Sequence, residues 1–139
     1  MRKFTWIILL FVLFLTGCGK ANTAIVEIPE KMFMTQVADV YANQSNYIGK
    51  TLKLEGIYGE NTIEDITYKS VYRKNPGCCG SDGTSGFEIE WNDKNLKIGE
   101  WIEVVGVLEQ YTENNEKYLR IKATDLNVLS KRGLEFVTQ

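Results

Sequence analysis

The sequence contains no histidine, and this absence excludes several classes of function. Ser-His-Asp and Cys-His catalysis both need an imidazole base, and histidine is also the commonest metal ligand. The chain also lacks an excess of positive charge, because 18 Asp and Glu outnumber 16 Lys and Arg. An acidic chain has no electrostatic footprint for phosphate backbones, so we expect no nucleic acid among its partners.

Long apolar runs are also scarce, and the one clear run lies at the N-terminus. Arg2 and Lys3 precede the apolar residues 7–15 (IILLFVLFL), and the small residues Thr16 and Gly17 follow. This order is typical of a secretory signal, and the run is short for a bilayer crossing, which needs about 20 residues. Residues 15–18 (LTGC) resemble the lipobox of bacterial lipoproteins, which implies a lipid anchor with palmitate on Cys18.

The anchor sets the expected organisation and location of the chain. We expect a signal peptide at 1–17, a lipidated tether at 18–29 and one folded domain at 30–139. Without Arg2 and Lys3, 14 basic residues face 18 acidic ones, a net charge of −4. We therefore expect an extracytoplasmic protein of the cell envelope, with the membrane and an envelope protein as partners.

Hydrophobic periodicity changes once along the domain. Phe33, Val37, Val40 and Tyr41 recur at helical spacing, which predicts a helix within 28–46 that faces the core. From Tyr47 onward apolar residues alternate, which predicts short strands. The predicted strands are 51–58, 68–73, 86–91, 100–108 and 117–122, with 125–129 extending or following the last, and a hairpin turn at 113–116.

Two segments repeat one glycine pattern. Gly49 and Gly56 enclose six residues of the first strand, and Gly99 and Gly106 enclose six residues of the fourth. A glycine inside a strand often marks a bulge or a barrel corner. Together these features predict a mainly β fold, a small OB-like five-stranded barrel with one N-terminal helix.

A family resemblance rests on three strings, 47–56 (YIGKTLKLEG), 78–82 (CCGSD) and 99–106 (GEWIEVVG), and on the closing strand 118–123. They resemble the OB-like extracytoplasmic domain of the DUF1980 family, which is related to YcgQ-type bacterial membrane proteins. In that family the domain is attached to transmembrane helices, whereas here we expect a lipid anchor. The resemblance implies no established activity.

The most unusual stretch is the glycine-rich loop 75–86, which carries Cys78 and Cys79 side by side and Asp82 after them. Outside the cytoplasm the two thiols are expected to be a vicinal disulfide or packed small hydrophobes. Alternatively, two thiolates and Asp82 supply ligands for Zn²⁺ or Cu⁺. The third alternative is thiol–disulfide exchange, since a strained vicinal disulfide is easily reduced.

Function is predicted from these features by elimination. We expect a non-enzymatic binding or accessory module for a partner protein or small ligand, with no cofactor. The alternatives are metal handling through the Cys78–Cys79 loop as a transporter accessory, and a thiol–disulfide redox protein. Aromatic stacking on single-stranded nucleic acid would use Tyr58, Tyr68, Tyr72 and Phe87, but strand aromatics are more often core residues. Glu88 and Glu90 are expected on the solvent face of a strand.

Overall fold

The structure is a computed structural model that describes residues 24–77, 82–92 and 95–138. It consists of one six-stranded sheet, one α-helix and two short 3₁₀ helices. The elements in chain order are β1 (Val26–Ile28), η2 (Glu30–Met32), α2 (Phe33–Ala42), η3 (Gln44–Asn46), β2 (Thr51–Ile63), β3 (Ile66–Pro76), β4 (Asp82–Glu90), β5 (Trp101–Glu113) and β6 (Glu116–Val128).

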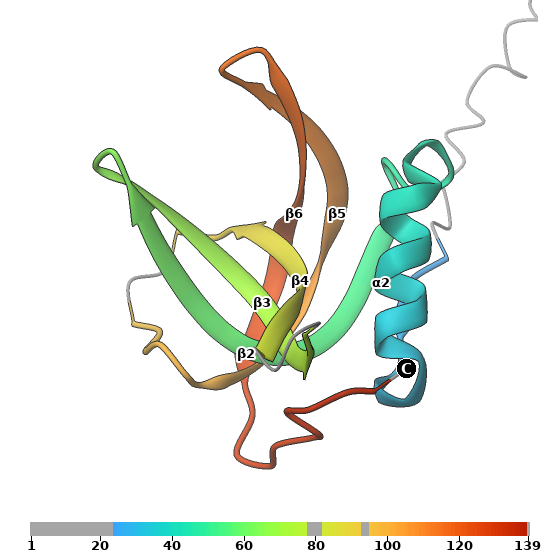
Figure 1. The fold of residues 1–139 in the computed structure, drawn as a ribbon, viewed down its shortest axis with the longest axis vertical. Helices are drawn as coiled ribbons and strands as arrows, with labels where there is room; N and C mark the ends of the chain where they lie inside the picture. The colour runs from blue at the N-terminus through green and yellow to red at the C-terminus, as the bar shows by residue number, and fades with distance from the viewer. Residues whose placement is uncertain (1–23, 78–81, 93–94, 139) are drawn as a thin grey trace, which may run out of the picture.

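Five of the strands close into a barrel (Figure 1). The sheet order is β1-β2-β3-β4-β6-β5, and β5 pairs with β2 to complete the circle. The long strand β2 serves two neighbours, so that Ile57 pairs with Trp101 on β5 and with Tyr72 on β3. Strands β4 and β6 run parallel, and the other barrel pairs are antiparallel. The mainly β, OB-like five-stranded barrel with one N-terminal helix is thereby confirmed.

Glycines lie where the long strands approach their neighbours most closely. A side chain at Gly56 would place its Cβ 2.7 Å from the carbonyl oxygen of Tyr72. The ladder between β5 and β6 shifts register between Val105 and Gly106, where the sequence predicted a bulge. Gly49 and Gly99, which precede β2 and β5, have φ angles of +85° and +91° and open space around the position of a Cβ. Backbone geometry is therefore what calls for glycine at all four positions.

Helix α2 covers one side of the barrel (Figure 1). It is shorter than the predicted range 28–46, because 3₁₀ turns take up its two flanks. Phe33, Val37 and Val40 are buried against the barrel core, as their spacing predicted. Tyr41, the fourth residue of the predicted stripe, is partly exposed and stacks on the Phe87 ring at 5.3 Å. The helix therefore completes the core of the barrel.

Strand β1 differs from the sequence-based expectation, which placed this segment in the tether. Val26–Ile28 runs parallel to β2, with Val26 opposite Leu52 and Ile28 opposite Leu54. Ile28 is buried in the core. The physical reason is that the free edge of β2 offers backbone partners, and Ile28 gains burial by pairing there.

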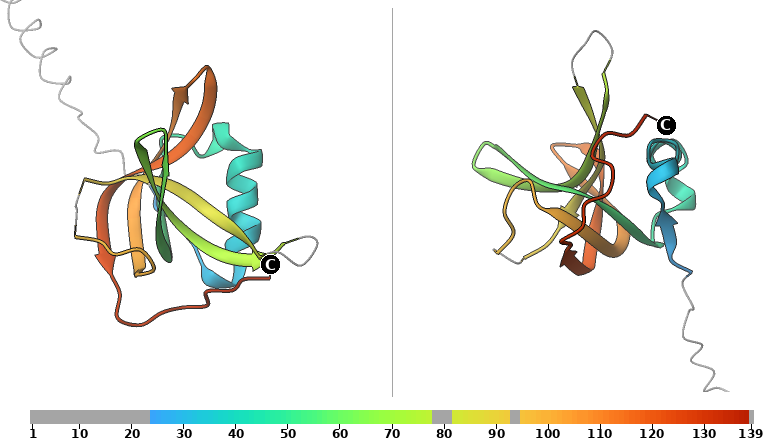
Figure 2. Two further views of the ribbon diagram at one scale, coloured as in Figure 1. Left: turned by 60° about the vertical axis from the view of Figure 1, so that its left-hand side comes forward. Right: turned by 90° about the horizontal axis from the view of Figure 1, so that it is seen from below.

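Two hairpins project from the barrel on the side away from the C-terminal segment (Figure 1). Their turns contain Glu64-Asp65 and Asn114-Asn115, and all four residues have positive φ. The second turn lies where it was predicted. The C-terminal segment after β6 crosses the opposite end of the barrel to reach the start of α2 (Figure 2). Within the described residues, no helix has both the length and the apolar character that crossing a membrane requires.

Candidate functional site

The described residues do not show the arrangement of the two cysteines in the glycine-rich loop 75–86. Cys78 and Cys79 lie outside them, as does Cys18. Asp82 is the first residue of β4, opposite Pro76, and its side chain is exposed. In the ranges 24–77, 82–92 and 95–138, no group of three or more His, Cys, Asp or Glu is placed to hold a metal ion. The disulfide, metal and redox alternatives thus stay predictions.

The described part of the chain does contain a polar cavity of 330 Å³ beside the two hairpins, which we name the hairpin cleft. The first residues of β3, the last residues of β4 and both strands of the second hairpin contribute to it. Its lining consists of Ile66, Thr67, Tyr68, Lys69, Glu88, Ile89, Glu90, Trp91, Asn92, Tyr111, Glu113 and Arg120. Side chains from four strands therefore meet at one cavity, and the residues that line it lie between positions 66 and 120 of the chain.

Two tyrosine–carboxylate pairs bridge this cleft. The hydroxyl of Tyr111 on β5 donates to Glu88 Oε2 on β4 at 2.6 Å. The hydroxyl of Tyr68 on β3 donates to Glu113 Oε2 on β5 at 2.9 Å. Burial and the hydrogen bond to Glu88 raise the pKa of Tyr111, and burial is the main cause of the raised pKa of Glu88. The tyrosine hydroxyls therefore remain protonated donors that fix the orientation of two carboxylates.

Arg120 on β6 is held by two further carboxylates. Its Nε donates to Glu109 Oε1 at 2.7 Å, and its Nη2 lies 2.9 Å from Glu90 Oε2. The guanidinium also lies over the ring of Tyr111, at 4.7 Å from the centroid. Tyr111 in turn packs against Tyr118 with ring centroids 5.6 Å apart. Arg120 is thus already engaged by protein groups.

Trp91 closes the cleft at the end of β4. Lys69 donates from Nζ to the Trp91 carbonyl oxygen at 2.6 Å. The indole Nε1 is buried and has no hydrogen-bond partner among the described residues. A buried donor without an acceptor costs about 1–3 kcal/mol.

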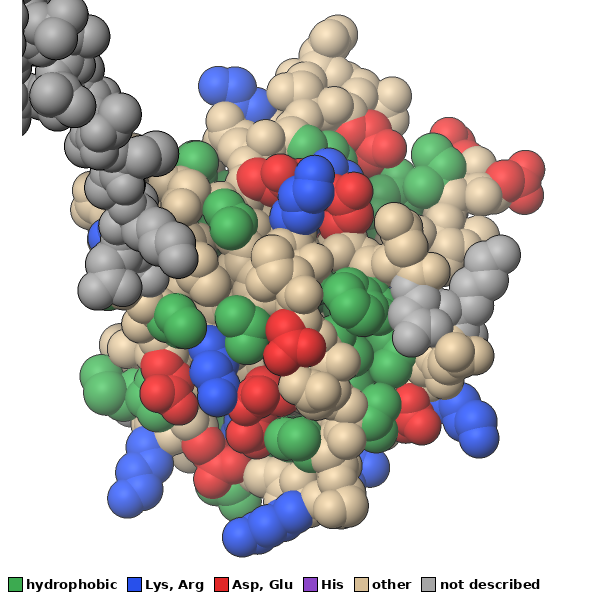
Figure 3. Space-filling model, turned by 180° about the vertical axis from the view of Figure 1, so that it is seen from behind, with side chains coloured by type: hydrophobic (Ala, Val, Ile, Leu, Met, Phe, Trp, Pro, Cys, Tyr) green, Lys and Arg blue, Asp and Glu red, His purple; other side chains and the backbone are tan. Residues whose placement is uncertain are grey.

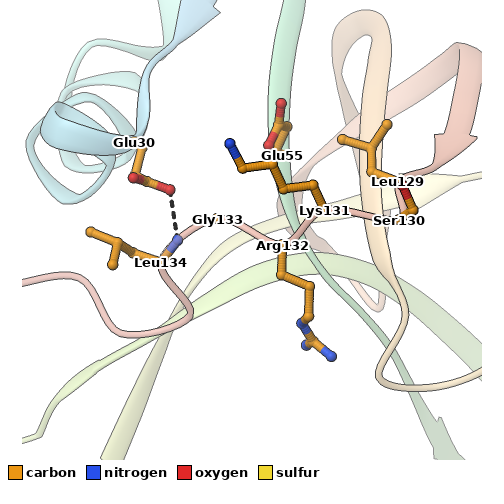
Figure 4. A pocket seen from close by; sticks show the side chains of 8 residues that line it. All are labelled: Glu30, Glu55, Leu129, Ser130, Lys131, Arg132, Gly133 and Leu134. Atoms are coloured by element: carbon orange, nitrogen blue, oxygen red, sulfur yellow. Dashed lines mark hydrogen bonds between the residues drawn. The ribbon is translucent and has the colours of Figure 1, made fainter.

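A second cavity, of 590 Å³, lies at the other end of the barrel (Figure 4). It is lined by Glu30, by Glu55 and by residues 129–134 of the C-terminal segment. Glu30 turns its carboxylate toward the backbone of Leu134, whose N–H donates to Glu30 Oε2 at 2.6 Å. The contacts around this cavity fasten the C-terminal segment to the barrel.

Arg73 is the centre of that fastening, and its side chain is 2% exposed. Its Nε donates to the Glu55 carbonyl oxygen at 3.0 Å. Its Nη1 donates to Glu30 Oε2 and to the Leu134 carbonyl oxygen, each at 3.0 Å. The buried cation therefore joins β2, η2 and the C-terminal segment, and we assign this region a structural role.

Comparison with known proteins identifies the family of the chain. The family described as the DUF1980 C-terminal domain matches residues 18–137. The chain belongs to this family. No curated protein matches it. Among solved structures, the chain is similar to the N-terminal domain of PriB protein from Thermoanaerobacter tencongensis, with 18% identity and a TM-score of 0.35 over 58% of this chain and 97% of that one.

The predicted resemblance to the DUF1980 family is thus confirmed, while the link to YcgQ-type membrane proteins and the lipoprotein signal stay predictions. Of the four aromatics considered for stacking, Tyr58 and Phe87 are 1% and 2% exposed and cannot act as platforms. Tyr68 lines the hairpin cleft. Figure 3 shows acidic and basic side chains interleaved on one face of the DUF1980 domain, without a surface of one sign.

Sequence reasoning did not find the hairpin cleft. Glu88 and Glu90 were expected on the solvent face of a strand, but both are half-buried and paired with Tyr111 and Arg120. A signal was present in the alternation of Glu109, Tyr111 and Glu113, which places three polar side chains on one face of the strand. Alternation alone does not predict which side chains of other strands this face contacts.

Proposed function

We propose that this DUF1980 chain is a non-enzymatic binding or accessory module that is lipid-anchored at Cys18 outside the cytoplasm. It binds a small ligand or a segment of an envelope protein in the hairpin cleft. The observation that carries the proposal is the pre-formed lining of the cleft. Hydrogen bonds from Tyr68 and Tyr111 orient Glu113 and Glu88, respectively. Ion pairs with Glu90 on β4 and Glu109 on β5 hold Arg120 in place. Side chains fixed before binding lose little conformational entropy when a ligand arrives.

The chemistry of the cleft supports binding rather than catalysis. A tyrosine acts as a base or a nucleophile only when its pKa is lowered. Burial and the carboxylate partner raise the pKa of Tyr111, and the hydrogen bond to Glu113 raises that of Tyr68. Both hydroxyls therefore stay protonated at neutral pH. Arg120 is engaged by carboxylates on two sides. The tyrosines and Arg120 therefore offer hydrogen bonds and charge to a ligand rather than a base or a nucleophile.

The proposed anchor is close to the domain. Val26, the first residue of β1, lies eight positions after Cys18, and an extended chain of eight residue steps spans at most about 28 Å. A lipid on Cys18 would therefore keep the barrel within one domain diameter of the bilayer. A ligand on or near the membrane surface would be in reach of the cleft.

The binding role is tested with the full-length chain and fractions of a bacterial cell envelope. A ligand that binds the folded state raises the melting temperature by mass action. We expect one fraction to raise the melting temperature of the wild type and to lose most of that effect with Trp91→Ala. A stabilisation that is equal in wild type and Trp91→Ala would contradict binding in the cleft.

The anchor has its own test. Cells that express the full-length chain are labelled with radioactive palmitate, and the membrane and soluble fractions are separated. We expect label and membrane association in the wild type and neither in Cys18→Ser. Label that persists in Cys18→Ser would refute the anchor without bearing on the cleft.

A further inference from the structure

The hairpin cleft offers hydrogen-bond acceptors that the protein leaves unused. Glu88 and Glu113 each accept a tyrosine hydroxyl through Oε2. In the described part of the chain, no group donates to the Oε1 atom of either carboxylate. Since an ionised carboxylate has about four acceptor sites, most of this capacity remains open. The ligand must therefore carry donors.

Trp91 contributes its ring to the wall of the cleft, while its indole Nε1 is buried and out of reach of a ligand. The open carboxylate oxygens therefore decide which ligand groups bind. A hydroxyl group donates a hydrogen bond to a carboxylate without carrying a charge, whereas a fully ionised phosphate group offers no donor.

Aromatic rings line the cleft beside these polar groups. Tyr68, Tyr111 and Trp91 all contribute to its wall, and Tyr118 extends the row by packing on Tyr111. Rings of this kind present large apolar faces with a polar edge. They suit a ligand whose hydroxyls lie around the rim of a flat C–H surface, as in a pyranose ring.

The charge of the lining argues against ionic ligands. Three carboxylates, Glu88, Glu90 and Glu113, stand against two cations, Lys69 and Arg120. The lining thus has a formal net charge of −1. Both cations are already engaged, Lys69 by the Trp91 carbonyl and Arg120 by carboxylates. A polyanion would find no available cation, and a polycation would lie against Arg120.

The length of the surface favours a chain of such rings. A third cavity, of 210 Å³, adjoins the hairpin cleft and is lined by Glu90, Trp91, Asn92, Lys122 and Ala123. It shares Glu90, Trp91 and Asn92 with the hairpin cleft, so that Trp91 stands in the wall common to both. A ligand that crosses Trp91 would contact both cavities, which requires more than one sugar unit.

From these contacts we infer that the hairpin cleft binds an uncharged oligosaccharide, with Trp91 at the centre of the site. This inference rests on the proposed binding function and names its ligand class. Hydroxyl groups bind the Oε1 atoms of Glu88 and Glu113. Pyranose faces stack on the rings of Tyr68 and Trp91, since Arg120 and Tyr118 already pack on the Tyr111 ring.

The test is isothermal titration calorimetry of the full-length chain with chitotetraose and with maltotetraose. The chain is kept in lauryldimethylamine oxide, because a detergent with a sugar headgroup would compete. We expect at least one tetrasaccharide to bind. Trp91→Ala removes the ring that is shared by the two cavities, and we expect binding about tenfold weaker. Tyr111→Phe releases Glu88 and should weaken binding by a similar factor.

Tyr47→Phe is the matched control. It also removes a hydrogen bond from a tyrosine hydroxyl to a carboxylate, that of Asp39, but this pair lies outside the cleft. We expect unchanged affinity for this variant. Far-UV circular dichroism and melting temperature show whether each variant is folded, and Glu88→Gln replaces any variant that is not.

The outcomes separate the ligand class from the binding function. Absence of heat with both tetrasaccharides, or equal affinity of wild type and Trp91→Ala, overturns the inference. If an envelope fraction stabilises the wild type but not Trp91→Ala, and periodate oxidation of the fraction leaves that effect intact, the cleft binds a ligand other than a sugar. Binding of tetralysine instead of the sugars would likewise overturn the oligosaccharide and leave the binding function standing.

Discussion

The guanidinium carbon of Arg73 lies 4.8 Å from the centroid of the Trp101 ring, and the two side chains are buried together. The same carbon lies 4.9 Å from the centroid of the Phe33 ring. The cation is thus enclosed by two aromatic rings and by three protein acceptors at its edge. A buried charge is tolerated only when it is satisfied in this way.

Replacing Arg73 with methionine should therefore destabilise the domain strongly. Methionine fills much of the same volume, but the carbonyls of Glu55 and Leu134 lose their donor. We expect a loss of about 3 kcal/mol in the free energy of unfolding, measured by urea denaturation. Arg132→Met is the control, because Arg132 lies over the same Trp101 ring at 5.7 Å but is exposed. Its effect should stay below about 0.5 kcal/mol. Equal losses in both variants would contradict the role of Arg73.

Glu30→Gln should make stability less dependent on pH. The Leu134 N–H and the Arg73 guanidinium hold the pKa of Glu30 below its usual value of 4.5. A lowered folded pKa means that the ionised carboxylate adds stability above the unfolded value, and that this stability is lost as pH falls through the folded value. Glutamine cannot titrate. Because Glu30 is partly exposed, we expect a loss of about 1 kcal/mol at neutral pH.

The measurement is urea denaturation of wild type and Glu30→Gln at several pH values from neutral down to about pH 3. The difference in unfolding free energy between the two proteins should be constant above about pH 5 and should become smaller below the usual glutamate pKa. The other carboxylates titrate alike in both proteins, so their contributions to the pH dependence of stability cancel in the difference. A gap that does not change with pH would refute the charged role of Glu30.

The strands and the barrel were predictable because alternation reports directly on the sheet face. Leu52 and Leu54 share one face and are both buried, as their spacing indicated. The turn at Asn114-Asn115 was predictable too, since asparagine tolerates positive φ. The ends of the strands were less predictable, because polar residues continue both hairpins well beyond the barrel core.

The hairpin cleft was not predictable from the sequence, because its contacts depend on register between distant strands. Glu88 meets Tyr111, which lies 23 residues further along the chain. No periodic pattern specifies such a pairing. Arg73 is an intermediate case. It shares the inward face of β3 with the buried Val71, which alternation indicates, but its acceptors on three other segments become visible only in the fold.

Two glycines provide a paired test of backbone packing. A Cβ at Gly106 would lie 2.4 Å from the Lys122 carbonyl oxygen, whereas a Cβ at Gly49 would meet nothing within 4 Å. Gly106→Ala should therefore cost about 3 kcal/mol through steric displacement of β6. Gly49→Ala should cost about 1 kcal/mol, from its positive φ alone. Thermal and urea denaturation measure both, and a larger loss for Gly49→Ala would contradict this register.

The adjacent thiols are tested by stability and by metal binding together. A disulfide between Cys78 and Cys79 would close a minimal loop and would restrict the unfolded chain very little. We therefore expect the Cys78→Ser/Cys79→Ser variant to lose less than about 1 kcal/mol of unfolding free energy. Titration of the full-length chain with Zn²⁺ and with Cu⁺ is made in parallel. Stoichiometric binding that this variant and Asp82→Asn both lose would establish a metal site in the loop. A large loss of stability without metal binding would instead indicate a specific local structure around the two cysteines.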